Sequence, residues 1–115
     1  MIGHYAHIVA MHSVVVGKDA LIADKVFISD CSHRFKDTMH PIIKQGIELL
    51  NPVTIGDGAW IGENVSIFGA SVGEHSIIGA NSVVTTDIPS FSVAVGTPAK
   101  VVKYYDFDIK KWRHV

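Results

Sequence analysis

Residues 55–84 read IGDGAWIGENVSIFGASVGEHSIIGANSVV and carry a six-residue repeat. Each unit begins with a branched apolar residue, with one shorter step in the array: Ile55, Ile61, Ile67, Val72, Ile78 and Val84. A glycine follows four of these, and the fifth position is small or apolar: Ala59, Val65, Ser71, Ser76 and Ser82. Six is a multiple of two but not of the helical period, so the recurring side chain stays on one face of an extended chain. The stretch therefore predicts a repeat protein with short strands.

The same period extends upstream in a weaker form, from residue 4 to residue 33. We take its first positions to be His4, Ala10, Val16, Ile22 and Ile28. Between Arg34 and Pro52 the spacing stops, and proline, which cannot donate to a strand ladder, occurs twice in that segment. A polar interruption between two repeat arrays predicts an excursion loop, in which a short helix through Ile42 to Leu50 is one alternative.

These patterns predict one all-β domain over residues 1–115. A coil of three short strands and three turns takes about eighteen residues, and stacked coils bury their inward side chains on one another. The expected division is first coils over 4–33, an excursion loop over 34–52, main coils over 53–96 and a C-terminal tail over 97–115. The repeats amount to about four coils of a triangular prism. We expect the tail to form a final strand followed by a short helix.

Composition narrows the functional classes. Apolar residues make up 48% and charged residues 18%, which predicts a folded, soluble chain. The net charge of -1 argues against a general nucleic-acid binder, and no apolar run is long enough for a membrane helix. With no apolar leader and a single cysteine, Cys31, the expected compartment is the cytoplasm. Lysines and arginines are absent from Gln45 to Ala99 and resume at Lys100, so we expect any bound anion near the tail.

At the level of motifs, IGDGAWIGENV, IGANSVV and GTPAKVV closely resemble the hexapeptide-repeat acyltransferases, and in particular the sugar O-acetyltransferases of the maltose, galactoside and O-antigen or capsular polysaccharide type. The resemblance covers nearly the whole chain and implies a left-handed parallel β-helix. It also implies acetyl-CoA as co-substrate, a sugar or polysaccharide precursor as acceptor, and a homotrimer whose active sites lie between subunits.

The resemblance implies that His33, in the motif SDCSHRF, is the general base. A neutral imidazole at a rigid edge is suited to take the acceptor's proton, so that the hydroxyl attacks the thioester directly. Backbone N–H groups of a neighbouring coil would then stabilise the oxyanion. Asp30, three residues earlier, is a candidate to orient the imidazole or contact the sugar, with a polar turn residue as the alternative. For Cys31 we favour a structural role over that of a nucleophile.

For coenzyme A, the resemblance places the pantetheine arm in the groove between adjacent prisms. Trp60 should project outward and contact that arm or the sugar, or lie in a subunit contact, and Gly62 belongs to the same WIGENV motif. By motif, Ala80 and Thr85 of GANSVVT contact the arm. Lys100 of GTPAK approaches the phosphates, with Lys103 as a second cation.

Two other functions remain open. The spacing of His7 and His12 is that of two zinc ligands in the γ-class carbonic anhydrases, but the upstream third histidine of that class has no counterpart, so we expect no metal site. A shortened, non-catalytic trimeric scaffold is the other alternative. The stretch HIVAMHSVV lacks the acidic, asparagine-containing segment with which the maltose and galactoside branch grips its sugar. The simple-sugar specificity of that branch therefore does not carry over, and polysaccharides or nucleotide-linked sugars are at least as strongly favoured as acceptors.

Overall fold

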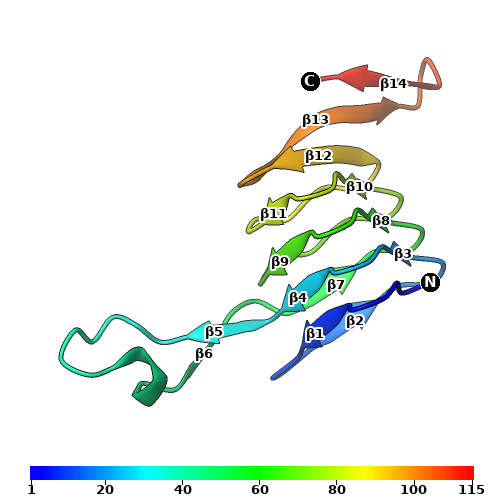
Figure 1. Ribbon diagram of the computed structural model, residues 1–115. Helices are drawn as coiled ribbons and strands as arrows, with labels where there is room; N and C mark the ends of the chain where they lie inside the picture. Colours follow the sequence, from blue (N-terminus) through cyan, green and yellow to red (C-terminus); the bar gives the residue numbers. More distant parts are fainter.

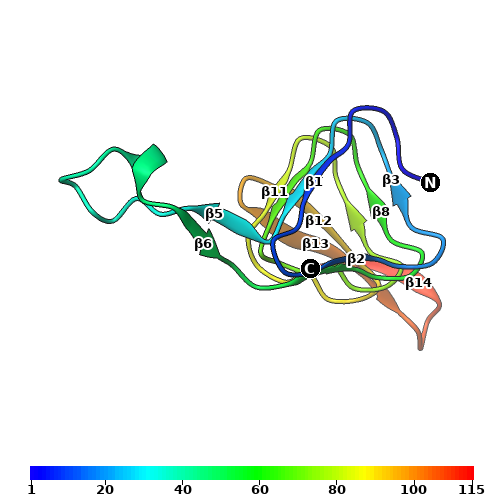
Figure 2. The ribbon, with the colours of Figure 1, turned by 90° about the horizontal axis from the view of Figure 1, so that it is seen from below.

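The computed structural model describes residues 1–115 as an elongated all-β molecule in which the chain winds around one axis (Figure 1). Successive strands lie on three faces of a triangular prism, as the view along the axis shows (Figure 2). Within the coils, each strand pairs in parallel with the strand one turn further along the chain, as solenoid repeats do. The predicted all-β class is confirmed.

Three faces make up the prism. The first face contains β1 (His7–Val9), β4 (Phe27–Ser29), β9 (Ser66–Phe68) and β11 (Val83–Val84). The second contains β2 (Val14–Val16) and β7 (Val53–Ile55), continued by single bridges from Ile55 to Val72 and from Val72 to Ile88. The third contains β3 (Leu21–Ile22), β8 (Trp60–Ile61), β10 (Ile77–Ile78) and β12 (Ser92–Gly96).

The core is a set of columns running along the axis. On the third face Ile22, Ile61 and Ile78 are in register and fully buried, and columns of the same kind line the other two faces. All six first-position residues of the 55–84 array are buried, so the predicted inward orientation is confirmed. Four of the five predicted fifth positions are buried as well: Ala59, Val65, Ser76 and Ser82.

In the first turn, the predicted repeat frame is wrong. Ile2 is bridged to Ile22 and Ile8 is in register with Ile28, so these two residues, rather than His4 and Ala10, occupy the first positions. The frame shifts because the chain between the first and second faces is two residues longer here than a regular step, which counting back from Val16 does not reveal.

The first corner, between the first and second faces, is the only one whose length varies strongly. The chain crosses it from Ile8 to Val16, from Ile28 to Ile55, from Ile67 to Val72 and from Val84 to Ile88. At the short step Ala70, not Ser71, takes the buried position before Val72. Gly69 makes this tight corner possible because its φ is 55° and a Cβ there would lie 2.6 Å from Leu50 Cβ.

The longest crossing of that corner is a hairpin that projects away from the prism (Figures 1 and 2). It consists of β5 (Cys31–His33), a single 3-10 turn at Ile42–Lys44 and β6 (Ile47–Leu49), which pairs antiparallel with β5. The alternative of a helix from Ile42 to Leu50 is therefore wrong beyond its first turn. Strand β5 also begins before the predicted loop boundary at residue 34.

Beyond the last coil, the tail forms the predicted final strand, but a second antiparallel strand stands where a short helix was expected. β13 (Ala99–Asp106) pairs with β12, and β14 (Lys111–His114) pairs with β13. The predicted C-terminal helix is wrong because Tyr105 and Trp112 pack edge-on across the two strands, with ring centroids 5.5 Å apart. Asp106 also forms an ion pair with Arg113, at 3.1 Å, that closes the hairpin. No helix has the length and apolar character needed to cross a bilayer.

Candidate active site

His33 is exposed at the base of the projecting hairpin. The backbone of His33 is positioned by its pairing with Ile47 in β6. The next residue, Arg34, donates its backbone N–H to the carbonyl of Gly46 at 3.0 Å. At the prism side, the Leu50 N–H donates to the Asp30 carbonyl at 2.8 Å. The imidazole therefore stands on a hydrogen-bonded ladder directly beside the first corner, accessible to another molecule.

Asp30 is buried and serves the scaffold. One carboxylate oxygen accepts the Met11 N–H and the other accepts the N–H groups of His12 and Ser13, each at 2.8 Å. These bonds, that from Met11 first, hold the pKa of the Asp30 carboxyl below its usual value. The carboxylate ties the first corner of one turn to the root of the hairpin on the next, and no hydrogen bond joins it to His33. A catalytic role for Asp30 stays a prediction.

The hydrogen bonds of Asp30 should make the stability of the fold depend on pH in the acid range. Because the folded-state pKa of Asp30 is lowered, its contribution to stability is complete above the unfolded pKa and is lost as pH falls through the folded value. For Asp30→Asn we expect a melting temperature about 5 °C or more lower at neutral pH, with a smaller further loss below about pH 4 than in the wild type. Thermal melts followed by circular dichroism across the acid range measure this. Asp108→Asn, an exposed matched control, should melt like the wild type throughout.

Cys31 lies two residues before His33 in β5 and is buried. The Ser29 hydroxyl donates to the Cys31 carbonyl at 2.8 Å and accepts the Cys31 N–H at 3.1 Å, and the two side chains approach to 3.5 Å. The thiol is enclosed in this turn, where the chain leaves β4 for the hairpin. These contacts agree with the structural role expected for the cysteine.

Trp60 projects outward from the third face and is 48% exposed, which confirms its predicted orientation. In register beside it lie Leu21 and Ile77, followed by Val93 and then Lys103 of β13. We call the residues Leu21, Trp60, Ile77 and Val93 the apolar row. The apolar row runs along the prism, and the next residue in register after Val93 is the cation Lys103.

The other predicted cofactor residues divide between two edges of the prism. Gly62, Ala80 and Lys100 gather at the end of the third face: a Cβ at Gly62 would lie 2.7 Å from the Ala80 backbone nitrogen, and Lys100 pairs with Val95 beside Gly79. Thr85 lies at the first corner instead, in a shallow hollow with Leu50 and Phe68. One copy of the chain therefore does not bring Thr85 and His33 together with Trp60 and Lys100.

No cluster of three or more His, Cys, Asp or Glu side chains comes together in a way that could hold a metal ion. His7 packs its ring against Phe27 edge-on, with centroids 5.2 Å apart. His12 lies at the first corner, where its backbone N–H is bonded to Asp30.

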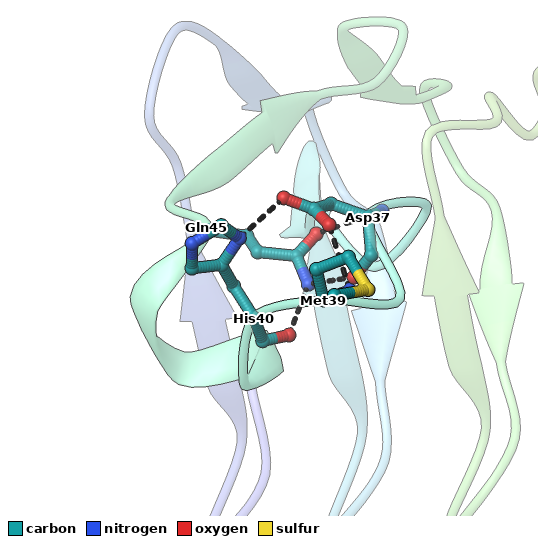
Figure 3. Close-up of polar contacts among 4 residues, drawn as sticks. All are labelled: Asp37, Met39, His40 and Gln45. Carbon is teal, nitrogen blue, oxygen red and sulfur yellow. Dashed lines mark hydrogen bonds and ion pairs between the residues drawn. The ribbon is translucent and has the colours of Figure 1, made fainter.

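A second polar site, which was not predicted from the sequence, lies in the outer part of the hairpin. A hollow of about 610 Å³ opens there, and the cations Arg34, Lys36 and Lys44 line it. Figure 3 shows the bonds that shape its wall: the Gln45 amide donates to the carbonyls of Asp37 and His40, at 2.6 and 2.8 Å. The signal in the sequence was three basic residues within one excursion loop.

The chain is also similar to known proteins. The family model described as "Hexapeptide repeat of succinyl-transferase" matches residues 52–86. The chain is 41% identical to a putative lipopolysaccharide biosynthesis O-acetyl transferase of Escherichia coli (strain K12), over 96% of this chain and 60% of that protein.

The fold is also found among solved structures. A galactoside acetyltransferase in complex with coenzyme A matches with a TM-score of 0.73 and 34% identity, over 91% of this chain and 57% of the other. A maltose O-acetyltransferase from Clostridium difficile 630 matches with a TM-score of 0.59 and 31% identity, over 91% of this chain and 69% of the other. The chain spans 60% of the length of the Escherichia coli relative.

Proposed function

This chain belongs to the hexapeptide-repeat acyltransferase family, and from that premise we propose that it moves an acetyl group from acetyl-CoA to a hydroxyl of a sugar or polysaccharide precursor. His33 is the general base in this proposal. The observation that carries it is the exposed imidazole at the hydrogen-bonded root of the hairpin. We further propose that the prism is wound left-handed in about four coils, as the resemblance implies.

In the proposed reaction His33 accepts the proton of the acceptor hydroxyl as that oxygen forms its bond to the acetyl carbon. Acetyl-CoA supplies a thioester, whose sulfur leaves with the electron pair of the broken bond. An imidazole nitrogen must reach the hydroxyl within hydrogen-bond distance. The ladder between β5 and β6 restricts where the imidazole can lie. Asp30 contributes indirectly, because its carboxylate holds the corner from which β5 starts.

The apolar row offers a fit for the pantetheine arm of coenzyme A. Its four side chains run along the third face without an intervening charge, and Lys103 follows in register. Lys100 is exposed two pairs away along β13, where it pairs with Val95 and suits the phosphates. Because Gly62 has no side chain, the coil that carries Ala80 can stack closely on it at this edge.

A homotrimer would unite the two halves of the site. His33 and Thr85 lie at the first corner, whereas Trp60 and Lys100 lie on or beyond the third face. Closed symmetric association, with the first corner of one copy beside the third face of the next, would bring the base to the thioester. We therefore propose three equivalent sites, each built by two copies.

The proposal is tested by incubating the purified protein with acetyl-CoA and a panel of mono- and oligosaccharides, while free CoA thiol is measured. We expect thiol release that depends on the acceptor, together with O-acetylated product in the mass spectrum. Calorimetry with CoA alone supplies an independent measurement. Absence of both CoA binding and turnover would favour the non-catalytic scaffold.

Lys100→Gln should weaken acetyl-CoA recognition without harming chemistry. The substitution removes the proposed hydrogen bond between the Lys100 ammonium group and a phosphate of coenzyme A. We therefore expect the KM for acetyl-CoA to rise by about tenfold, while kcat at saturation stays near the wild-type value. Steady-state kinetics at fixed acceptor concentration measures both. Lys18→Gln removes the same charge from the exposed turn that precedes β3, whereas Lys100 lies near the end at which the strands of the third face finish, so this control should leave both constants unchanged. An unaltered KM in Lys100→Gln would remove this residue from the site.

A further inference from the structure

The hollow in the outer hairpin is adjacent to His33 through the chain itself. Arg34 follows His33 directly, and Lys36 lies two residues further on. Neither of these side chains, nor that of Lys44, has a carboxylate oxygen within 4.0 Å, since the only ion pairs of the chain are His40 with Asp37 and Arg113 with Asp106. Three cations thus share one concave surface without an anionic partner.

Arg34 is already oriented. Its Nε donates to the Ile47 carbonyl at 3.1 Å, across the hairpin. That bond holds the guanidinium plane while the two terminal amino groups keep their donors for another partner. A guanidinium fixed in this way is suited to a planar carboxylate or a phosphate, because both accept parallel hydrogen bonds.

The part of the hollow lined by Asp37, His40 and Gln45 is cross-linked by hydrogen bonds within the loop. The Gln45 side chain bridges the loop by accepting the Asp37 N–H at 3.2 Å and donating to two carbonyls. Figure 3 shows these bonds together with the contact between the Asp37 carboxylate and the His40 ring, at 2.7 Å. A loop with such cross-links loses less conformational entropy when it binds a ligand than a free one does.

The two carboxylates of the hollow do not cancel its positive charge. One oxygen of Asp37 accepts the Met39 N–H and the other contacts His40, so this carboxylate is already engaged on both sides. Glu48 is the second, and the cations still outnumber the carboxylates by one. An anion entering the hollow therefore meets free donors.

We propose that this hollow binds an anionic group, a carboxylate or a phosphate, of the acceptor saccharide. The inference rests on the proposed function, because it places that group beside the base that would deprotonate an acceptor hydroxyl. It narrows the acceptor class to acidic or phosphorylated sugars, and it assigns a second anion site, separate from the basic tail.

Direct binding tests the inference without turnover. The full chain is titrated with glucuronic acid, glucose 1-phosphate and glucose, and the dissociation constants are measured by calorimetry. We expect at least one anionic probe to bind about tenfold or more tightly than glucose, with the difference shrinking as salt is raised to about 0.3 M. Preference for glucuronic acid indicates a carboxylate ligand, and preference for glucose 1-phosphate indicates a phosphate. Equal binding of all three overturns the inference.

Arg34→Gln and the double variant Lys36→Gln/Lys44→Gln tie that preference to the hollow. Each should reduce the anionic preference by about tenfold, leave glucose binding unchanged and leave the affinity for CoA unchanged. Lys18→Gln is the matched control and should keep the full preference. A preference that survives both hollow variants also overturns the inference.

The two proposals fail separately. If an anionic probe binds in an Arg34-dependent way but no acceptor is acetylated, the acetyltransferase function fails and the anion site stands. If neutral and anionic acceptors are acetylated with equal kcat/KM, the function stands and the anion site fails.

Discussion

Replacing His33 with alanine is expected to lower kcat for acceptor-dependent acetyl transfer by about 10²- to 10⁴-fold, the usual cost of losing a general base. The imidazole stands exposed at the root of the hairpin, and no other histidine of this chain lies within the β5–β6 ladder. Because His33 lies at the first corner, whereas the apolar row and Lys100 belong to the third face, the KM for acetyl-CoA should change little. Free thiol release at saturating acetyl-CoA measures the first effect, and its dependence on acetyl-CoA concentration measures the second.

Two comparisons make the His33 experiment decisive. His4→Ala removes an exposed imidazole from the first turn of the prism and should retain wild-type kcat. A circular dichroism spectrum identical to that of the wild type shows that His33→Ala keeps its fold. If the folded His33→Ala turns over as fast as the His4 control, His33 is not the base.

Ile61→Ala is expected to be the most destabilising simple truncation in the molecule. Ile61 is completely buried in the middle of a column, between Ile22 and Ile78 in the neighbouring strands. Coils above and below hold these neighbours in place, so the cavity collapses poorly and the loss should reach about 2 to 5 kcal/mol. This corresponds to a fall in melting temperature on the order of 10 °C.

Thermal or urea unfolding at one fixed protein concentration measures this loss, because association of copies would otherwise alter the apparent stability. The control is Ile43→Ala, which makes the same chemical change at a side chain that is 85% exposed in the hairpin. Its effect should stay within about 0.5 kcal/mol. Equal stability of the two variants would contradict the stacked-column description of the core.

The regular part of the fold was predictable because one physical constraint recurs at every turn. Each branched residue of the 55–84 array must face inward, and an extended chain returns to the same face after an even number of residues. The rule failed where corner length changed. The first turn crosses its first corner with two extra residues, and so Ile8 takes the place that the pattern assigned to Ala10.

The tail shows the limit of local pattern. The segment after Pro98 suggested a final strand followed by a short helix, yet β13 and β14 form a hairpin because the open edge of β12 offers unpaired backbone groups. The ring of Tyr105 then packs edge-on against those of Phe107 and Trp112. Long-range pairing decided the conformation, and the preference of the segment itself did not.

Of the candidate site, the sequence by itself determined the exposed position of Trp60 and the placement of His33 at a break in the repeats. Both follow from the six-residue period, which specifies where the inward pattern holds and where it stops. Only the tertiary structure decided the rest: Asp30 holds a corner, the predicted cofactor residues divide between two edges, and Arg34, Lys36 and Lys44 surround one hollow. The physical reason is that these relations arise from pairing between β5 and β6 and from stacking of successive coils, so they depend on contacts that a one-dimensional spacing does not contain.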